Sequence, residues 1–190
     1  MKKIILFLAI VLSVTPVFAQ TMWKSDPNHS KLNFSTIHLG IADVEGLFNK
    51  FDVTIEASKE DFSDAVFTLT VDMASVDTEV EMRDNHLKSA DFFDVETYPQ
   101  MTFRSTSIQE TEKNKYKLTG DLTLHGITKP VTMDLWYRGT LDNGPDKPKV
   151  SGFQLTGAIS RSEFNIGPKF SETVISDEVK IKADGEFKTQ

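Results

Sequence analysis

Apolar and polar side chains alternate through most of the stretch Ala65-Val66-Phe67-Thr68-Leu69-Thr70-Val71-Asp72-Met73. Successive side chains of a β-strand point to opposite faces of the sheet, so a period of two residues is typical of a strand whose faces differ in polarity. The stretch therefore predicts a strand over residues 65–73 with one apolar and one polar face.

The same period of two recurs along the chain. It predicts further strands at residues 31–35, 51–57, 101–103, 116–124, 131–137, 153–159 and 179–187. Turn-forming sequences separate several of them, notably Asp142-Asn143-Gly144-Pro145 and Gly126-Ile127-Thr128-Lys129-Pro130. About eight strands of this kind in one chain predict an all-β, barrel-like domain.

One segment between these strands breaks the pattern. Thr78-Glu79-Val80-Glu81 has the spacing of a capping box and predicts a short helix through about Leu87. Aromatic and apolar residues follow it, and Pro99 ends the segment. We expect this insertion, residues 78–99, to cover one end of the barrel.

Length and composition limit the classes of protein that the chain can represent. It has 190 residues, enough for one sizeable domain, with 39% hydrophobic and 26% charged residues, as in a folded protein. It has no cysteine, which excludes a disulfide scaffold, a thiolate zinc site, a Cys nucleophile and an iron–sulfur cluster.

The N-terminus has the features of a secretory signal peptide. Lys2 and Lys3 precede the apolar run Ile4–Val14, and Val17-Phe18-Ala19 offers small residues for cleavage. We predict a signal peptide over residues 1–19, one domain over residues 20–190, and a periplasmic or secreted location. Cleavage would leave 19 of the 21 basic residues against 28 acidic ones, a net charge of −9. That charge predicts no nucleic-acid partner, and no second apolar segment is long enough for stable membrane insertion.

Alternation alone leaves two kinds of barrel open. A soluble barrel has its apolar face inside, whereas an outer-membrane barrel has it outside. The expected strands are short for a tilted membrane strand, which needs about 9–11 residues. The 3 Tyr and 2 Trp are too few for two aromatic girdles. These features favour the soluble barrel.

No catalytic or metal-binding motif stands out. The four histidines, His29, His38, His86 and His125, lack the spacing of a metal motif, and the chain has no HExxH, no Gly-x-Ser-x-Gly and no phosphate-binding glycine loop. We therefore predict no catalytic residue, no metal site and no cofactor. The alternative is a small-molecule hydrolase or isomerase that uses a histidine at the barrel mouth.

The alternating set is rich in side chains without a polar group. The chain has 14 Phe, and an eight-stranded barrel is wide enough either to fill itself or to hold one ligand. If the barrel is hollow, the predicted lining consists of Phe34, Phe51, Phe67, Leu69, Phe103, Leu122, Leu124, Met133, Leu135, Phe153, Leu155 and Phe187. If these residues instead pack a solid core, the chain is better interpreted as a stress-related interaction protein.

Four stretches resemble one family in the correct order. The most specific is the run Arg83-Asp84-Asn85-His86-Leu87-Lys88-Ser89-Ala90-Asp91-Phe92-Phe93-Asp94-Val95-Glu96-Thr97-Tyr98-Pro99, and the others are residues 23–40, 120–131 and 159–167, followed by a closing strand at 179–183. Together they resemble the YceI-like family of bacterial polyisoprenoid-binding proteins over nearly all of the mature chain. Asn165 stands where the family usually has Gly, and Asn tolerates a positive φ.

The resemblance implies a lipocalin-like, eight-stranded antiparallel barrel with an apolar channel. It implies an isoprenoid lipid as the ligand, with a tail of the quinone or polyprenyl-phosphate type, and it supplies no catalytic residues. Arg83 and Arg161 are our candidates to bind the head group, because a guanidinium suits oxyanions. The alternative for Arg83 is a structural pair with Asp84 or Asp91. The sequence leaves the assembly open, a homodimer included.

Overall fold

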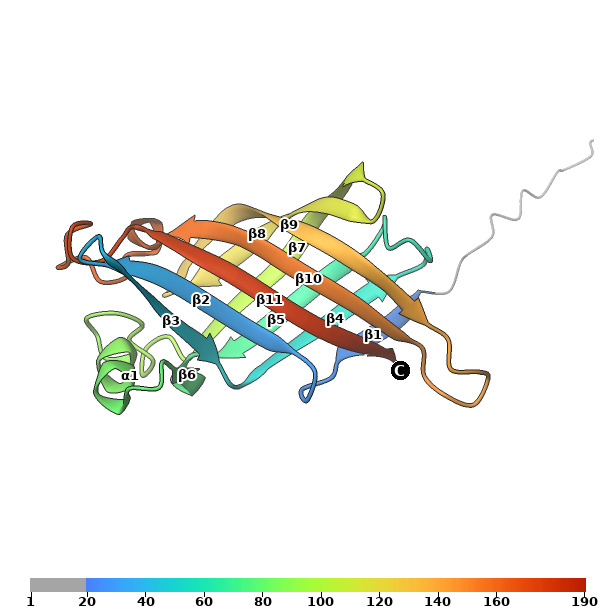
Figure 1. The fold of residues 1–190 in the computed structure, drawn as a ribbon, viewed down its shortest axis with the longest axis horizontal. Helices are drawn as coiled ribbons and strands as arrows, with labels where there is room; N and C mark the ends of the chain where they lie inside the picture. Colours follow the sequence, from blue (N-terminus) through green and yellow to red (C-terminus); the bar gives the residue numbers. More distant parts are fainter. Residues whose placement is uncertain (1–19) are drawn as a thin grey trace, which may run out of the picture.

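Strands that pair antiparallel throughout form one sheet in the computed structural model, which describes residues 20–190 (Figure 1). The predicted signal peptide, residues 1–19, lies outside the described residues. The strands are β1 (Thr21–Ser25), β2 (Lys31–His38), β3 (Ala42–Phe48), β4 (Phe51–Ala57), β5 (Val66–Asp72), β6 (Val76–Asp77), β7 (Gln100–Glu112), β8 (Lys115–Leu124), β9 (Ile127–Leu141), β10 (Val150–Ser160) and β11 (Glu178–Thr189). The helices are α1 (Glu81–Lys88) and the 3₁₀ turns Met73–Ser75 and Arg161–Phe164.

The sheet closes on itself through β11. Its C-terminal end pairs with β1, where Phe187 lies opposite Ser25, and its N-terminal part pairs with β2, where Ile181 lies opposite Phe34. Hydrogen bonding then runs around the ring β1-β4-β5-β7-β8-β9-β10-β11 and back to β1. The predicted eight-stranded antiparallel barrel is therefore confirmed.

The alternating pattern does not predict three of the strands: β1, β3 and β6. The strand β3 has Gly46 at an inward position, where the pattern expects a large apolar side chain. The ring of Phe34 on β2 occupies that space, and a Cβ at position 46 would overlap it. At this point of the wall, the apolar side chain is therefore Phe34 of β2 and not a residue of β3.

The capping box predicted at Thr78 is wrong, although the helix is present. The helix begins at Glu81, and Val80 at its N-cap makes no side-chain cap bond. Asp84 accepts hydrogen bonds from the Thr78 backbone N–H at 2.8 Å and from the Thr78 hydroxyl at 2.5 Å. Thr78 is therefore bound by the side chain of a residue inside α1 and does not itself cap the helix. The chain remains non-helical through Glu79, which has a φ of 63°.

Aromatic rings close one end of the barrel. Phe62, in the segment between β4 and β5, packs against Trp23 at 5.3 Å, Tyr137 at 5.0 Å and Phe153 at 5.0 Å between ring centroids. The hydroxyl of Tyr116 donates a 2.6 Å hydrogen bond to the backbone carbonyl of Asp61 and holds the same segment. This end, toward the C-terminus in Figure 1, is therefore closed.

The two faces of the barrel wall differ as the alternation predicts. Leu118 and Leu122 of β8 are buried, whereas Lys117 lies outside and pairs with Asp134 of β9 at 2.6 Å. The apolar set thus faces the interior, which is the orientation of a soluble barrel and the reverse of an outer-membrane one. In the described part of the chain, no helix has the length and hydropathy needed to cross a membrane.

A buried carboxylate fastens the turn between β1 and β2 to β11. Asp26, whose side chain is 6% exposed, accepts hydrogen bonds from Lys188 Nζ at 2.6 Å, from His29 Nδ1 at 3.0 Å and from the Asn28 N–H. The bond from Lys188, followed by that from His29, holds the pKa of Asp26 well below its usual range. The hydrogen bond to Asp26 in turn raises the pKa of His29.

We predict that Asp26→Asn lowers the free energy of unfolding at neutral pH and that the difference from wild type shrinks in acid. A carboxylate with a lowered pKa in the folded state stabilises the protein above the ordinary carboxyl pKa of about 4, and this stabilisation is lost as the pH falls through the lowered value. Urea denaturation between pH 7 and about pH 2 measures it. Asp52→Asn is the control, because its 3.5 Å pair with Lys24 is exposed. A difference that does not change with pH would contradict the prediction.

We predict that Gly120→Ala destabilises the barrel by about 1–3 kcal/mol through overpacking. Gly120 faces inward on β8, and a Cβ there would overlap the carbonyl oxygen of Arg104 and the ring of Phe103. Gly152→Ala is the matched control, since its Cβ would meet only Arg138 Cβ at 3.5 Å. Thermal and urea unfolding of both variants compare the two sites, and equal stabilities would refute the assigned overlap.

Candidate functional site

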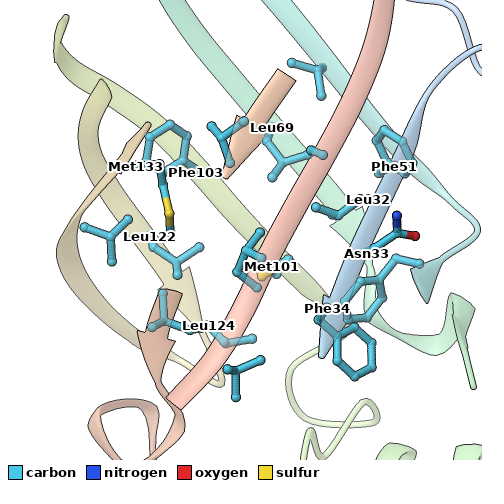
Figure 2. A pocket seen from close by; sticks show the side chains of 18 of the residues that line it. Leu32, Asn33, Phe34, Phe51, Leu69, Met101, Phe103, Leu122, Leu124 and Met133 are labelled. Carbon is cyan, nitrogen blue, oxygen red and sulfur yellow. The ribbon is translucent and has the colours of Figure 1, made fainter. Parts of the chain in front are cut away.

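The interior of the barrel is hollow. It contains a cavity of about 220 Å³, whereas about 10–15 Å³ on the same measure suffices for one water molecule. The wall is almost entirely apolar and is formed by inward side chains of the barrel strands, with further residues from the segments that cover one end (Figure 2). The space is therefore a chamber suited to an apolar ligand and much larger than a packing defect.

The wall includes every residue that the alternation named as a possible lining. These are Phe34, Phe51, Phe67, Leu69, Phe103, Leu122, Leu124, Met133, Leu135, Phe153, Leu155 and Phe187. Figure 2 shows side chains of this set facing one another across the cavity from different strands. Their contact with a lipid stays a prediction.

The cavity is also lined by residues that the predicted lining did not include, and they fall into two groups. Leu32, Val53, Met101 and Leu118 belong to alternating stretches and could have been included by extending the same pattern. The second group comes from loops or helices, where no period of two exists; it comprises Leu87, Phe92, Phe93, Ile166 and Ile175. Only the three-dimensional structure brings this group to the wall.

Two segments far apart in the sequence meet over the end of the barrel opposite the aromatic cluster. Phe92, after α1, stacks on Phe170 of the β10–β11 connection at 5.0 Å between centroids. Lys169 Nζ lies 2.6 Å from Asp91 Oδ1, and this hydrogen bond lowers the pKa of Asp91. Phe92 and Phe93 also line the cavity, so the insertion 78–99 shapes this mouth as expected.

Arg161 lies on the cavity wall, but its guanidinium is fully used by the protein. The residue is 5% exposed. Its five N–H groups donate at 2.7–3.2 Å to the backbone carbonyls of Ser176, Ile166, Gly167, Phe170 and Ile175. Arg161 therefore holds the connection 161–177 in shape, and no donor is left over for a head group.

Arg83 does not lie on the cavity wall. Its Nε donates to Thr78 Oγ1 at 2.8 Å and its Nη2 to the Thr78 carbonyl at 2.7 Å. The proposed pair with Asp84 or Asp91 is wrong, because Asp84 binds Thr78 and Asp91 binds Lys169 and His86. Arg83 joins α1 to the strand segment that precedes it.

None of the histidines in the described residues lies on the cavity wall. At the mouth, His86 Nε2 is 3.4 Å from Asp91 Oδ2, and His125 Nδ1 is 3.2 Å from the Phe164 carbonyl. At the other end, Asp26, His29 and Glu186 place possible metal-ligand atoms within 4.8 Å of one another. The ammonium of Lys188 already lies against Asp26 there, so the cluster has the partners of an ion-pair network.

Comparison with known proteins gives consistent matches. The family model described as the YceI-like domain matches residues 23–187. A UPF0312 protein of Staphylococcus aureus (strain USA300) is 37% identical over 171 residues, which are 88% of this chain and 97% of that protein.

Solved structures agree in fold. Burkholderia cenocepacia BcnA superposes with a TM-score of 0.75 at 30% identity, over 85% of this chain and 98% of that one. The Campylobacter jejuni YceI protein has a TM-score of 0.73 at 33% identity, over 81% and 90%. A polyisoprenoid-binding domain from Saccharophagus degradans shares the fold alone, with a TM-score of 0.64 at 15% identity over 92% of this chain and all of that domain. Both the family match and the barrel thus lead to one assignment: the chain belongs to the YceI-like family.

Proposed function

We propose that this protein binds a long-chain isoprenoid lipid in the barrel cavity and carries or sequesters it. The observation that supports this proposal is the barrel cavity of about 220 Å³ with an almost wholly apolar wall. The polyisoprenoid-binding domain of Saccharophagus degradans, which has the same fold, is consistent with it.

The chemistry of the wall is sufficient to retain a hydrocarbon chain. Burial of each CH₂ group contributes about 0.8 kcal/mol, and a long tail sums many such groups. Loss of translational freedom and ordering of the tail offset part of the gain. Such a site requires no charged residue, which agrees with the absence of a motif that marks it in the sequence.

We further propose that the head group inside the cavity is uncharged, of the quinone or alcohol type, and that a polyprenyl phosphate is disfavoured. Two cationic residues border the cavity, Arg161 and Lys31, and all the donors of Arg161 bind backbone carbonyls. Lys31 alternates with the inward Leu32 and is exposed. A buried phosphate would therefore have no cation to pair with, and an unpaired buried charge is strongly unfavourable.

Binding without catalysis is the activity that these features favour. The histidines at the mouth are engaged with Asp91 and a backbone carbonyl and do not face the cavity. We also propose export to the periplasm or beyond, supported by the signal-like residues 1–19. N-terminal sequencing of exported protein should then begin at Gln20. A homodimer stays a prediction that light scattering can test.

Ligand binding provides the direct test. We expect purified protein to carry an apolar adduct in native mass spectrometry and to bind the isoprenoid alcohol phytanol in calorimetry. Ala183→Trp should weaken phytanol binding at least about tenfold, because the indole would occupy the cavity that Ala183 lines. Lys182→Trp, on the outer face of the same strand, is the control. Absence of both the adduct and phytanol binding in wild type would refute the proposed function.

The preference for an uncharged head group is tested separately. Phytanyl phosphate should bind at least about tenfold more weakly than phytanol, because its phosphate lacks a partner inside. Calorimetry at two salt concentrations measures both ligands on the same wild-type preparation. Equal or tighter binding of the phosphate would show that a cation reaches the ligand.

Arg161→Lys should lower the free energy of unfolding by about 2–4 kcal/mol, since a lysine ammonium has three donors for five carbonyls. Faster hydrogen exchange over residues 161–177 should accompany the loss. Arg138→Lys is the control, because Arg138 stacks on Trp136 on the exposed face at 4.3 Å. A variant with wild-type stability and weaker phytanol binding would reverse the assigned role.

A further inference from the structure

One buried hydroxyl at the cavity wall has no hydrogen-bond partner. It is Ser30 Oγ, and within residues 20–190 no other buried side-chain nitrogen or oxygen lacks a partner. Ser30 is among the residues that line the cavity. Buried polar groups in native proteins are nearly always paired, so an unpaired one at the wall of a binding cavity calls for an explanation.

The hydroxyl lies on the inner face of the barrel, near its closed end. A Cβ built on Gly185 of β11 would come within 3.0 Å of both Ser30 Oγ and the ring of Phe187. Gly185 is paired with Phe153, which belongs to the aromatic cluster of the closed end. The Ile159–Val179 pair, nearer the mouth, lies six residues farther along the same two strands, a separation of about 20 Å.

The other polar residues that border the cavity either have partners or alternate with inward residues. Thr36 Oγ1 shares a 2.9 Å hydrogen bond with Ser176 Oγ. Asp184 accepts from Gln154 on the outer face at 2.7 Å. Lys31 and Asn33 also border the cavity, but both alternate with the inward Leu32, and Lys31 is exposed whereas Asn33 is half-buried. Within residues 20–190, Ser30 thus carries the buried hydroxyl of the cavity wall that has no partner in the protein.

We infer that Ser30 is a binding residue for the polar end of the lipid. Its hydroxyl forms a hydrogen bond with a single uncharged oxygen, a hydroxyl or a carbonyl, at the inner end of the ligand. This inference rests on the proposed function and adds a direction: the polar end enters first and lies beside Gly185, and the hydrocarbon tail extends toward the mouth between α1 and the β10–β11 connection.

Two matched probes separate this hydrogen bond from hydrophobic binding. Phytanol and phytane share one branched carbon skeleton and differ in the terminal hydroxyl. Wild type should bind phytanol about five- to tenfold more tightly than phytane, the ratio that corresponds to one net hydrogen bond. Ser30→Ala should remove this preference while phytane affinity stays unchanged. Ser35→Ala, on the outer face of β2, should retain it.

The stability of the ligand-free variant distinguishes a binding role from a structural one. Because Ser30 Oγ has no partner in the protein, Ser30→Ala should leave the unfolding midpoint unchanged or raise it. A lowered midpoint together with an intact preference for phytanol would overturn the inference. If wild type binds neither probe, the proposed function fails; if it binds both and Ser30→Ala keeps the preference, only the Ser30 inference fails.

Fluorescence quenching tests the direction of the lipid. The chain has two tryptophans, and Trp23 packs in the closed-end cluster, 5.3 Å from Phe62. In a Trp136→Phe background, phytanol brominated beside its hydroxyl should quench Trp23 more strongly than phytanol brominated at the far end. The opposite order would overturn the proposed direction, and equal quenching would do the same.

Discussion

The pairing of one strand, β11, with two successive strands is the constraint on which the cavity depends. β1 and β2 are separated by the turn 26–30, yet both hydrogen-bond to β11 and so act as one interrupted wall. A sheet that failed to close here would expose its apolar face and could not enclose a chamber. The buried Asp26 lies at this interruption and binds Lys188 of β11, so an ion pair adds to the backbone hydrogen bonds that Asp26 and His29 make with Glu186.

Closure alone does not make a barrel hollow, because eight strands are also compatible with a filled interior. Whether the interior is filled depends on how large and small side chains are distributed along the barrel axis. Trp23, Phe62, Tyr137 and Phe153 gather at one end and fill it. Beside this cluster on β11, Gly185 and then Ala183 present almost no side chain, and both line the remaining space. At the mouth, α1 buries none of its residues, and polar anchors at Thr78, Asp91 and Arg161 hold the covering segments together with the packing of Phe92 on Phe170.

Alternation was a good predictor of the wall and a poor one of the ends. Every strand with a long alternating run was found, and many inward members of those runs line the cavity, because alternate side chains of a closed barrel point to its interior. The short β1 and β6 have too few residues to show a period of two. In β3 the alternation is interrupted by Gly46, because the ring of Phe34 occupies the space on its inward side. The predictions for residues at the mouth were wrong for another reason. Thr78 and Arg161 were assigned roles from their residue types, but their partners, Asp84 and a set of backbone carbonyls, are fixed by tertiary contacts that no local pattern contains.

The failed assignment of Arg161 bears on the chemistry of the ligand. An arginine beside an apolar chamber suggests anion binding only while its donors are unoccupied, and here each donor has a carbonyl acceptor. Breaking even one of these bonds to reach a phosphate would leave a buried carbonyl unpaired, at a cost similar to the gain. Among the other buried side-chain polar atoms of residues 20–190, only Ser30 Oγ has no hydrogen-bond partner. A neutral hydroxyl can satisfy one neutral oxygen and cannot compensate a buried charge. Under the proposed function, we therefore expect the polar atoms of the wall to select against charged lipids and the apolar atoms to provide the affinity.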